Sequence, residues 1–398
     1  MVEVEYGAKP RRLLVLGAGP AQLGLLEAAR AHGIWTAVCD RDPGAPGFAL
    51  ADRRCIVSIE DELAVERLAS ALPIDGVISA GTNAPVAVAA RVAEKLGLDH
   101  PVSPATAQLA TNKLRRREAL AAAGVPQPMW EVASGEDATI ELPLPVVVKA
   151  ADRGSPPVLV RTASGLGPAI AAARAAARSG AVLVEEYLDG PELTVTGFSA
   201  EGEFVPLAVT DRSSDEGAAF GVPLAYSWPS VHAETAAEVT RRAVEALGIV
   251  DGPTHTQLRL SRGGPEVVAI AARLGGGHDS ELVELVTGID LTGLALAAAL
   301  GQPIAASEIR AAFRTTVGGA ATRFLVSPPG TLESVEVPQG LKGVVSTRLY
   351  REPGHVFGPL RRSSDRAGAV LAAGVSAQEA LTRVAAAVER IRFVTVDA

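Results

Sequence analysis

A lysine and three acids stand at the ends of two short apolar segments of this chain. Lys149 closes the apolar part of VVVKAADRGS, and Glu185, Glu186 and Glu192 lie in VLVEEYLDGPELTV. Both segments are rich in β-branched residues and are predicted to be strands, which would bring the four side chains to one cleft. A lysine amine suits a polyphosphate, whereas a carboxylate suits the amino group of a base or the hydroxyls of a ribose. The pattern predicts a nucleotide pocket.

A second group of polar residues flanks these strands. Lys113 begins a predicted helix that ends at the break GVPQP, where glycine and proline stop it. Downstream, VVAIAARLGGG places Arg273 shortly before a run of glycines. A guanidinium fork suits a developing oxyanion and a transferring phosphoryl group, and glycines let the backbone approach closely.

In their order along the chain, these motifs resemble those of the ATP-grasp superfamily of carboxylate ligases. The likeness covers GAGPAQLG, TNKLRRREALAAAGVPQP, the lysine strand, EEYLDGPE, THTQLRL, the arginine-glycine run and GVSAQEAL. It implies a chain of the α/β and α+β classes with an ATP-grasp fold. An N-terminal doubly wound, Rossmann-like domain (residues 1–111) would precede a small lid subdomain (112–187) and a larger C-terminal catalytic domain with an extension (188–398).

The resemblance assigns the nucleotide phosphates to two lysines and a loop, and the adenine and ribose to the EEYLDGPE segment, which we call the hinge. The nucleotide-binding residues it implies are Lys113, Lys149, Gly154, Ser155, Glu185, Glu186, Leu188 and Glu192. It also implies that Arg273 stabilises the phosphorylated intermediate.

The expected magnesium ligands are incomplete. ATP-grasp ligases present a carboxylate on the strand before the arginine, often with Asn two residues on, whereas this chain has Ala269 and Ala271. The other ligand strand offers Gln257, a neutral amide. Two explanations stay open: Ala269 is an engineered replacement of a glutamate, or the chain is a natural variant with weak or repurposed activity.

The residues after the arginine are candidates for the acceptor pocket. The predicted substrate residues are Gly275, Gly276, His278 and Ser280, with Arg348 from the tail as a partner for a substrate carboxylate. His255 lies on the same predicted strand as Gln257. No group of His and Cys has zinc spacing.

The resemblance therefore implies an ATP- and Mg²⁺-dependent ligase that joins a small carboxylate, such as an amino acid, to an amine through an acyl phosphate. The implied homologues are closest to amino-acid and dipeptide ligases and are often homodimers. Two alternatives stay open: a catalytically silent nucleotide- or metabolite-binding protein, and a carboxylating enzyme similar to those of purine synthesis.

Composition excludes several other classes. The chain has 398 residues, 48% apolar and 21% charged, with a formal charge of -8. This is typical of a globular protein of two or three domains and argues against a nucleic-acid surface. No segment has the length of apolar sequence that a signal or membrane span needs, so we expect a cytoplasmic protein without membrane partners. Cys39 and Cys55 are expected to be buried, reduced thiols.

The first 110 residues alternate strands and helices. Strands are expected over 12–17, 36–39 and 76–79, and helices over 22–31 and 84–96. GAGPAQLG and Asp40 resemble a dinucleotide fingerprint, but the position of its third glycine is Gln22. This spacing argues against NAD. Later helices are expected over 113–123, 168–178, 234–247, 279–287 and 377–390.

Overall fold

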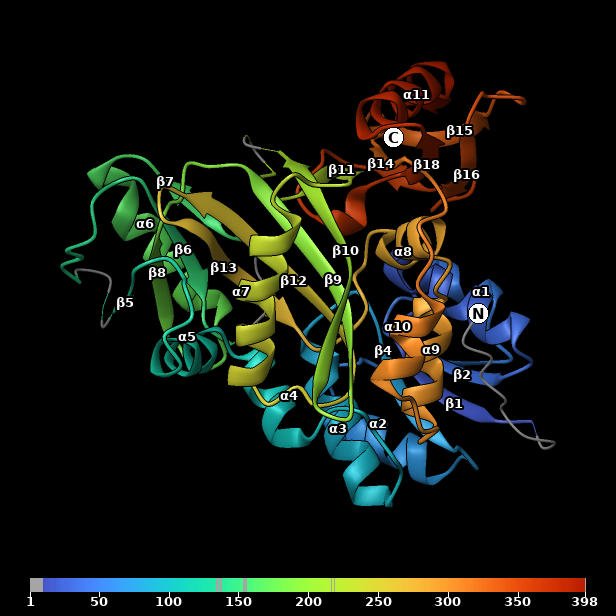
Figure 1. The fold of residues 1–398 in the computed structure, drawn as a ribbon, viewed down its shortest axis with the longest axis horizontal. Helices are drawn as coiled ribbons and strands as arrows, with labels where there is room; N and C mark the ends of the chain where they lie inside the picture. The colour runs from blue at the N-terminus through green and yellow to red at the C-terminus, as the bar shows by residue number, and fades with distance from the viewer. Residues whose placement is uncertain are drawn as a thin grey trace.

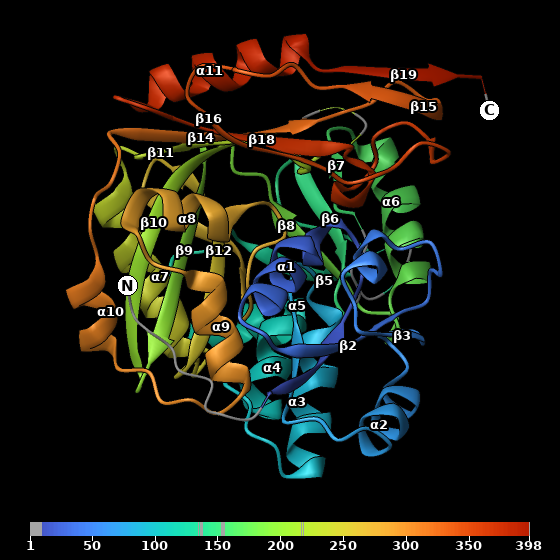
Figure 2. The same ribbon diagram turned by 90° about the vertical axis from the view of Figure 1, so that its right-hand side faces the viewer.

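The computed structural model describes residues 10–133, 135, 138–152, 156–215, 217 and 219–397. Within these residues the strands form four sheets, and Figures 1 and 2 show how the helices cover them. Gly154 and Ser155, predicted to cover a phosphate, lie outside the described residues.

The first sheet is parallel and has the order β3-β2-β1-β4. Its strands are β1 (Arg12–Leu16), β2 (Trp35–Asp40), β3 (Arg53–Ile56) and β4 (Gly76–Ser79), and its helices are α1 (Leu23–Ala31), α2 (Glu62–Ser70) and α3 (Ala84–Leu96). The alternation predicted from sequence is confirmed, while β3 and α2 were not predicted. The two cysteines are buried and free, and they face each other across β2 and β3.

The space beside the glycine turn after β1 is occupied by the Gln22 side chain. The Gln22 side chain is buried and donates to the Ala80 carbonyl at 2.5 Å, and a Cβ placed on Gly17 would lie 2.9 Å from its Cδ. Asp40 accepts hydrogen bonds from the amides of Ala18 (2.9 Å) and Asp42 (3.0 Å). Gln22, which departs from the fingerprint, and Asp40, which matches it, therefore both hold the turn together.

The small sheet has the order β5-β8-β6-β7 and is antiparallel. It comprises β5 (Trp130–Ala133), β6 (Val146–Ala150), β7 (Val158–Val160) and β8 (Val182–Glu186), preceded by α4 (Pro104–Thr111) and α5 (Lys113–Ala122) and covered by α6 (Ala163–Ala176). Helix α6 begins at Ala163 rather than at Pro168, so the proline lies inside the helix instead of starting it.

The large sheet has the order β13-β12-β9-β10-β11-β14-β18-β16. Its strands are β9 (Glu192–Ala200), β10 (Glu203–Ser214), β11 (Pro223–Trp228), β12 (Gly252–Ser261), β13 (Gly264–Ala271), β14 (Gly319–Leu325), β16 (Val344–Leu349) and β18 (Gly368–Gly374). The associated helices are α7 (Ala233–Ala246), α8 (Asp279–Thr287), α9 (Leu291–Ala299) and α10 (Ala306–Ala312). The third sheet, β17-β15-β19, is formed by β15 (Gly330–Glu336), β17 (Val356–Phe357) and β19 (Arg392–Val396), with α11 (Ala377–Arg390) nearby (Figure 2).

One hydrophobic cluster joins the first sheet to the large sheet. Leu13, Leu25 and Ile78 from the N-terminal part share it with Phe198 and Leu294. Helix α9 fits closely, because a Cβ on Gly76 would lie 2.1 Å from the Ala299 carbonyl oxygen. The N-terminal sheet is therefore fixed against the large sheet, while the small sheet has its own core around Val148, Ile170 and Val184.

No single helix in the described ranges is long and apolar enough to cross a membrane. Helices α8 and α9 pass that test only as a pair bent by 117°, and both contribute to the largest buried cluster.

The hinge between β8 and β9 requires glycine at position 190. A Cβ there would lie 1.8 Å from the Leu260 carbonyl oxygen, a backbone atom. Gly190→Ala should therefore lower the free energy of unfolding by about 1–3 kcal/mol in a urea titration, as overpacking does. Gly358→Ala is the matched control because nothing lies within 4 Å of its Cβ. Equal stability of the two variants would contradict this account of the hinge.

Candidate functional site

A cavity of about 190 Å³ lies between the small sheet and the large sheet. It is lined by α5, β6, the hinge, and strands β10, β12 and β13. The predicted residues that it brings together are Lys113, Lys149, Glu185, Glu186, Leu188, Glu192, Gln257 and Ala269. Arg116, Arg212 and Arg259, which were not predicted, also line it.

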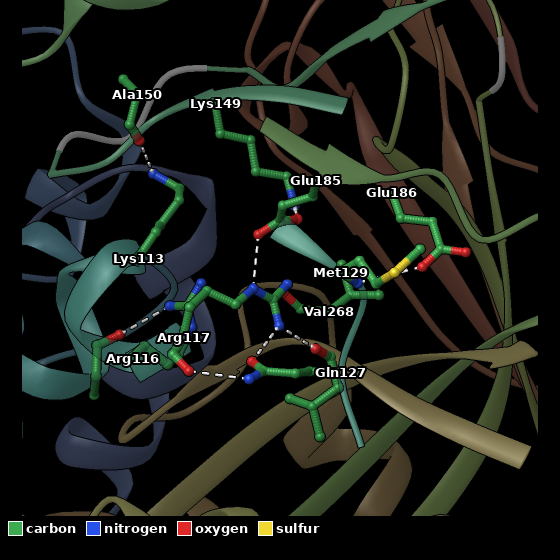
Figure 3. Close-up of polar contacts among 12 residues, drawn as sticks. Lys113, Arg116, Arg117, Gln127, Met129, Lys149, Ala150, Glu185, Glu186 and Val268 are labelled. Carbon is green, nitrogen blue, oxygen red and sulfur yellow. Dashed lines mark hydrogen bonds and ion pairs between the residues drawn. The ribbon is translucent and has the colours of Figure 1, made fainter. Parts of the chain in front are cut away.

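The centre of the site is a buried group of charges (Figure 3). Glu185 is 1% exposed; it accepts from Arg117 Nε at 2.8 Å and forms a short ion pair with Lys149 Nζ. Burial alone would raise the pKa of Glu185, but the charges of Arg117 and Lys149 lower it to about 2. Glu185 was expected to serve base or ribose. In this structure its carboxylate instead orients Lys149, the lysine predicted to bind phosphate.

Arg117 connects this group to the large sheet. The side chain is fully buried, and its Nη1 donates to the Val267 carbonyl at 2.6 Å and to Gln127 Oε1 at 3.1 Å. Its Nη2 donates to the Val268 carbonyl at 2.9 Å. One guanidinium therefore fixes Glu185 of β8, the loop before β5 and the part of β13 next to Ala269. Sequence reasoning missed this residue because KLRRRE is typical of a solvated helix face.

The two predicted lysines line the cavity from two different elements, β6 and α5. Lys149 comes from β6, whereas Lys113 is the first residue of α5 and donates to the Ala150 carbonyl at 2.7 Å. Burial lowers the pKa of Lys113 to about 7, and the nearby charges of Arg116 and Lys149 add to this effect. Clustered, desolvated cations of this kind are stabilised when an anion such as a polyphosphate binds.

The hinge forms the other side of the cavity. Glu186 points away from Glu185 and its carboxylate accepts from the Met129 amide at 3.3 Å (Figure 3). Leu188 is buried, and its carbonyl accepts from Arg259 Nη1 at 2.6 Å. The guanidinium carbon Cζ of Arg259 lies over the Tyr187 ring, 5.0 Å from the ring centroid. An apolar side chain next to exposed backbone groups suits a flat base.

Glu192, expected to contact ribose, lies between two arginines. Arg259 donates to its Oε1 from Nε (3.0 Å) and Nη2 (2.6 Å), and Arg212 Nε is 3.3 Å from its Oε2. Ser214 Oγ also donates to Oε2. These arginines were not predicted, because Arg212 and Arg259 become neighbours of Glu192 only through the pairing of β9 with β10 and β12.

The side chains of β12 and β13, the strands expected to supply the metal ligands, do not suit magnesium. Ala269 pairs with Gln257, and Ala271 pairs with His255, so neither β13 position offers an oxygen donor from its side chain. Gln257 Nε2 lies 3.5 Å from His255 Nε2. Among the described residues no group of three acids, histidines or cysteines is arranged to hold a metal ion. A magnesium site of the expected type is therefore not formed by this part of the chain.

Arg273 is connected to the main cavity through Asn83. Its Nε donates to Asn83 Oδ1 at 2.7 Å and its Nη1 donates to the Leu274 carbonyl at 2.6 Å. Asn83 lines the nucleotide cavity, whereas Arg273 itself lines a separate pocket beside His100 and Pro253. Its predicted contact with a phosphorylated intermediate stays a prediction, and its approach to the cavity would require the Asn83 bond to change.

The predicted substrate residues come together in a second, smaller cavity. Gly275, Gly276, His278, Ser280 and Arg348 all line it. The N-terminal sheet completes it through residues 20, 21, 24, 25 and 80. The glycine run thus contributes to this second cavity, while Val268 and Ala269 of the same segment line the first.

His278 is the unusual residue of the second cavity. It has a positive φ of 61°, is 8% exposed and stacks on Tyr350 at 6.1 Å between ring centroids. Neither ring nitrogen has a hydrogen-bond partner within the described part of the chain. Burial lowers the pKa of His278 to about 4, so the ring is neutral at pH 7. A strained, buried ring with unused nitrogens is typical of a ligand site.

Arg348 is already paired in the second cavity. Its Nη1 donates to Glu281 at 2.5 Å and its Nη2 to Glu27 at 2.6 Å. Arg366, not predicted, is buried nearby, stacks on Phe324 at 3.6 Å and donates to the Gly276 carbonyl at 3.4 Å. The tail of the chain therefore contributes one arginine to the cavity and a second that supports its glycine wall.

The buried guanidinium of Arg117 should dominate the stability of the site. Arg117→Ala leaves the Val267 and Val268 carbonyls and half of the Glu185 charge without a partner, so the free energy of unfolding should fall by about 3–5 kcal/mol. Arg115→Ala, on the exposed face of the same helix, should change it by less than about 0.5 kcal/mol. Urea titration measures both, and a loss below 1 kcal/mol for Arg117→Ala would contradict this role.

The lowered pKa of Lys113 predicts proton uptake on nucleotide binding. Between about pH 7 and pH 9 the amine of the nucleotide-free protein is largely neutral, and a bound polyphosphate favours its charged form. Affinity should therefore fall as pH rises through this window. Calorimetry at pH 8 in buffers of different ionisation enthalpy should show uptake of up to about one proton. Uptake should persist in Lys95→Met and vanish in Lys113→Met; heats independent of buffer in the unmodified chain would refute it.

Comparisons with known proteins agree with this geometry. Residues 169–281 match the family "ATP-grasp domain", and residues 323–396 match the family "L-amino acid ligase C-terminal domain 2". The fold is similar to the crystal structure of an L-amino acid ligase from Bacillus licheniformis, with a TM-score of 0.83, 24% identity and coverage of 98% of this chain and 100% of that chain. This confirms the predicted fold class.

Two curated relatives extend the comparison. An uncharacterized protein of Sinorhizobium fredii, y4rH, is 28% identical over 409 residues, which cover 96% of this chain and 83% of that protein. Dapdiamide A synthase of Enterobacter agglomerans is 26% identical over 187 residues, 44% of this chain and 43% of that protein. The domain match, the fold and the order of the lysines, hinge and glycine run together confirm the resemblance to the ATP-grasp superfamily.

Proposed function

We propose that this protein is an ATP-dependent ligase that joins a small carboxylate to an amine. The carboxylate takes the terminal phosphoryl group of ATP to form an acyl phosphate and ADP, and the amine then attacks the acyl carbon and releases phosphate. The observation that carries this proposal is that one segment of the chain lines both a cationic cavity, through Val268 and Ala269, and a smaller polar cavity, through Leu274 and Gly275. We assign the phosphates to the first cavity and the carboxylate substrate to the second.

The residues of the chain divide this work. Lys113 and Lys149 bind and orient the phosphates, while the hinge positions the base. Arg273 is proposed to stabilise the phosphorylated intermediate once its bond to Asn83 gives way, since a guanidinium suits that charge. The small sheet over the cavity is proposed to keep water from the acyl phosphate.

An amino acid is the proposed substrate class. The second cavity offers both charges of an α-amino acid, because Glu281 and Arg348 lie side by side in its wall. The match to the L-amino acid ligase C-terminal domain covers Arg348, and dapdiamide A synthase and the L-amino acid ligase are the relatives whose names support the class. The homodimer implied by the resemblance stays a prediction for light scattering.

The lack of acidic ligands favours a second candidate. Without a carboxylate at 269, the chain would be a nucleotide- or metabolite-binding protein that does not turn over. Both candidates bind a nucleotide in the first cavity, but only the ligase converts ATP to ADP and forms an amide.

One assay separates them. Purified full-length chain is incubated with ATP, with and without Mg²⁺, and with amino acids singly and in pairs; ADP is measured by coupled assay and amides by mass spectrometry. The ligase proposal predicts ADP and amide in equal amounts for at least one pair. Lys149→Met should reduce this rate at least about 100-fold, whereas Lys95→Met, on the surface, should not.

Two other outcomes contradict the ligase. ATP binding without ADP release in any mixture would support the silent binding protein. ADP release that needs bicarbonate rather than an amino acid would indicate a carboxylating enzyme.

A further inference from the structure

The first cavity is lined by several cations and has no acid at the two β13 positions where metal ligands were expected. At the two β13 positions that face Gln257 and His255, the chain carries the methyl groups of Ala269 and Ala271. Divalent cations in proteins are held by several oxygen ligands, usually carboxylates. A single neutral amide at Gln257 is far from that requirement.

Two of the three acids that line the cavity are neutralised by protein cations, while the third, Glu186, accepts a hydrogen bond from the Met129 amide at 3.3 Å. Glu185 is bound by Arg117 and Lys149, and Glu192 is bound by Arg212 and Arg259. These ion pairs occupy oxygens that a metal would otherwise use. Removing such a carboxylate from its arginines would leave buried charges unpaired, which costs several kcal/mol.

Asp279 is the nearest other buried acid. Its Oδ2 accepts from the Gly277 amide at 3.1 Å, and its Oδ1 lies 3.6 Å from His255 Nδ1. A Cβ on Gly275 would lie 2.1 Å from Asp279 Oδ2, so the carboxylate packs against the glycine run rather than toward Ala269. This carboxylate therefore supports the glycine run.

At the proposed phosphate end of the cavity three cations lie near one acid, Glu185, which pairs with Lys149. Lys113, Arg116 and Lys149 line it together, and burial lowers the pKa of both lysines, the direction expected when buried cations lie close to one another. An anion that binds there relieves this repulsion directly. When carboxylates face the phosphates, by contrast, a metal ion is needed to bridge like charges.

We propose that this chain binds the triphosphate of a nucleotide directly on its own lysines and arginines, without a divalent cation. The cavity thus takes free nucleotide, and a metal ion adds little to affinity. This goes beyond the proposed function, since it concerns the binding step and holds whether or not the chain turns over.

The test is calorimetry of the full-length chain with a non-hydrolysable ATP analogue. Titrations are made in excess EDTA and in excess Mg²⁺ at equal ionic strength. The dissociation constants should agree within about threefold, or be lower in EDTA. A loss of affinity of tenfold or more in EDTA would overturn the proposal, and so would binding that occurs only with Mg²⁺.

Variants at position 269 provide the matched comparison. Ala269→Glu places a carboxylate beside the phosphates and should weaken binding in EDTA by about tenfold or more, with recovery in Mg²⁺. Ala269→Gln has nearly the same shape without the charge and should bind alike in both conditions. Ala386→Glu adds the same charge on the exposed face of α11 and should behave as the unmodified chain.

The outcomes remain separable from those of the ligase assay. Thermal denaturation checks that each variant is folded, and the comparison on the unmodified chain decides the proposal even if a variant is not. Metal-independent binding without amide formation would leave this inference intact and overturn the proposed ligase. Amide formation with strictly metal-dependent binding would do the reverse.

Discussion

The buried contact of Arg117 with Glu185 is the interaction on which the site depends. A fully buried guanidinium is stable only when its donors are all used, and here they reach a carboxylate, an amide side chain and two carbonyls. Because Glu185 in turn holds Lys149, the phosphate lysine is placed by a helix that lies outside the small sheet (Figure 3). The same guanidinium also donates hydrogen bonds to β13, next to the position where a metal ligand would be expected. Arg117 therefore fixes the positions of both Lys149 and β13.

This arrangement explains how the cavity can keep a high density of positive charge. Glu185 and Glu192 each bind an arginine, so these two acids lower the repulsion among the cations while their oxygens are already used. The lysines are left desolvated and close together, which prepares the cavity for a polyphosphate. The alanine at 269 is consistent with this balance, because an unpaired acid there would repel a nucleotide bound without a metal ion.

Local sequence patterns predicted the parts of the fold that local physics determines. Strand β1, helix α3 and helix α11 could be located because their apolar periodicity and their ends are encoded within a few residues. Helix α6 was placed too late because its first turns carry no strong apolar pattern. The short β3, only partly buried, gave no signal at all.

The site was predictable as a set of residues and less so as a set of contacts. The predicted substrate residues Gly275, Gly276, His278 and Ser280 line one cavity, as their closeness in sequence suggested, and Arg348 joins them from β16. Arg117, Arg212 and Arg366 were missed, because an arginine in a charged run reads as solvated until tertiary packing buries it. Glu185 shows the same limit, since only the pairing of distant elements reveals that its charge is already used.

The most direct measurement of the central claim is oxygen transfer from substrate to phosphate. An amino acid labelled with ¹⁸O in its carboxylate is incubated with the chain, ATP and the partner amine, and the released phosphate is analysed by mass spectrometry. An acyl phosphate predicts one ¹⁸O atom in each phosphate formed with the amide, because the carboxylate oxygen leaves with the phosphoryl group. Amide formed with unlabelled phosphate would contradict the account.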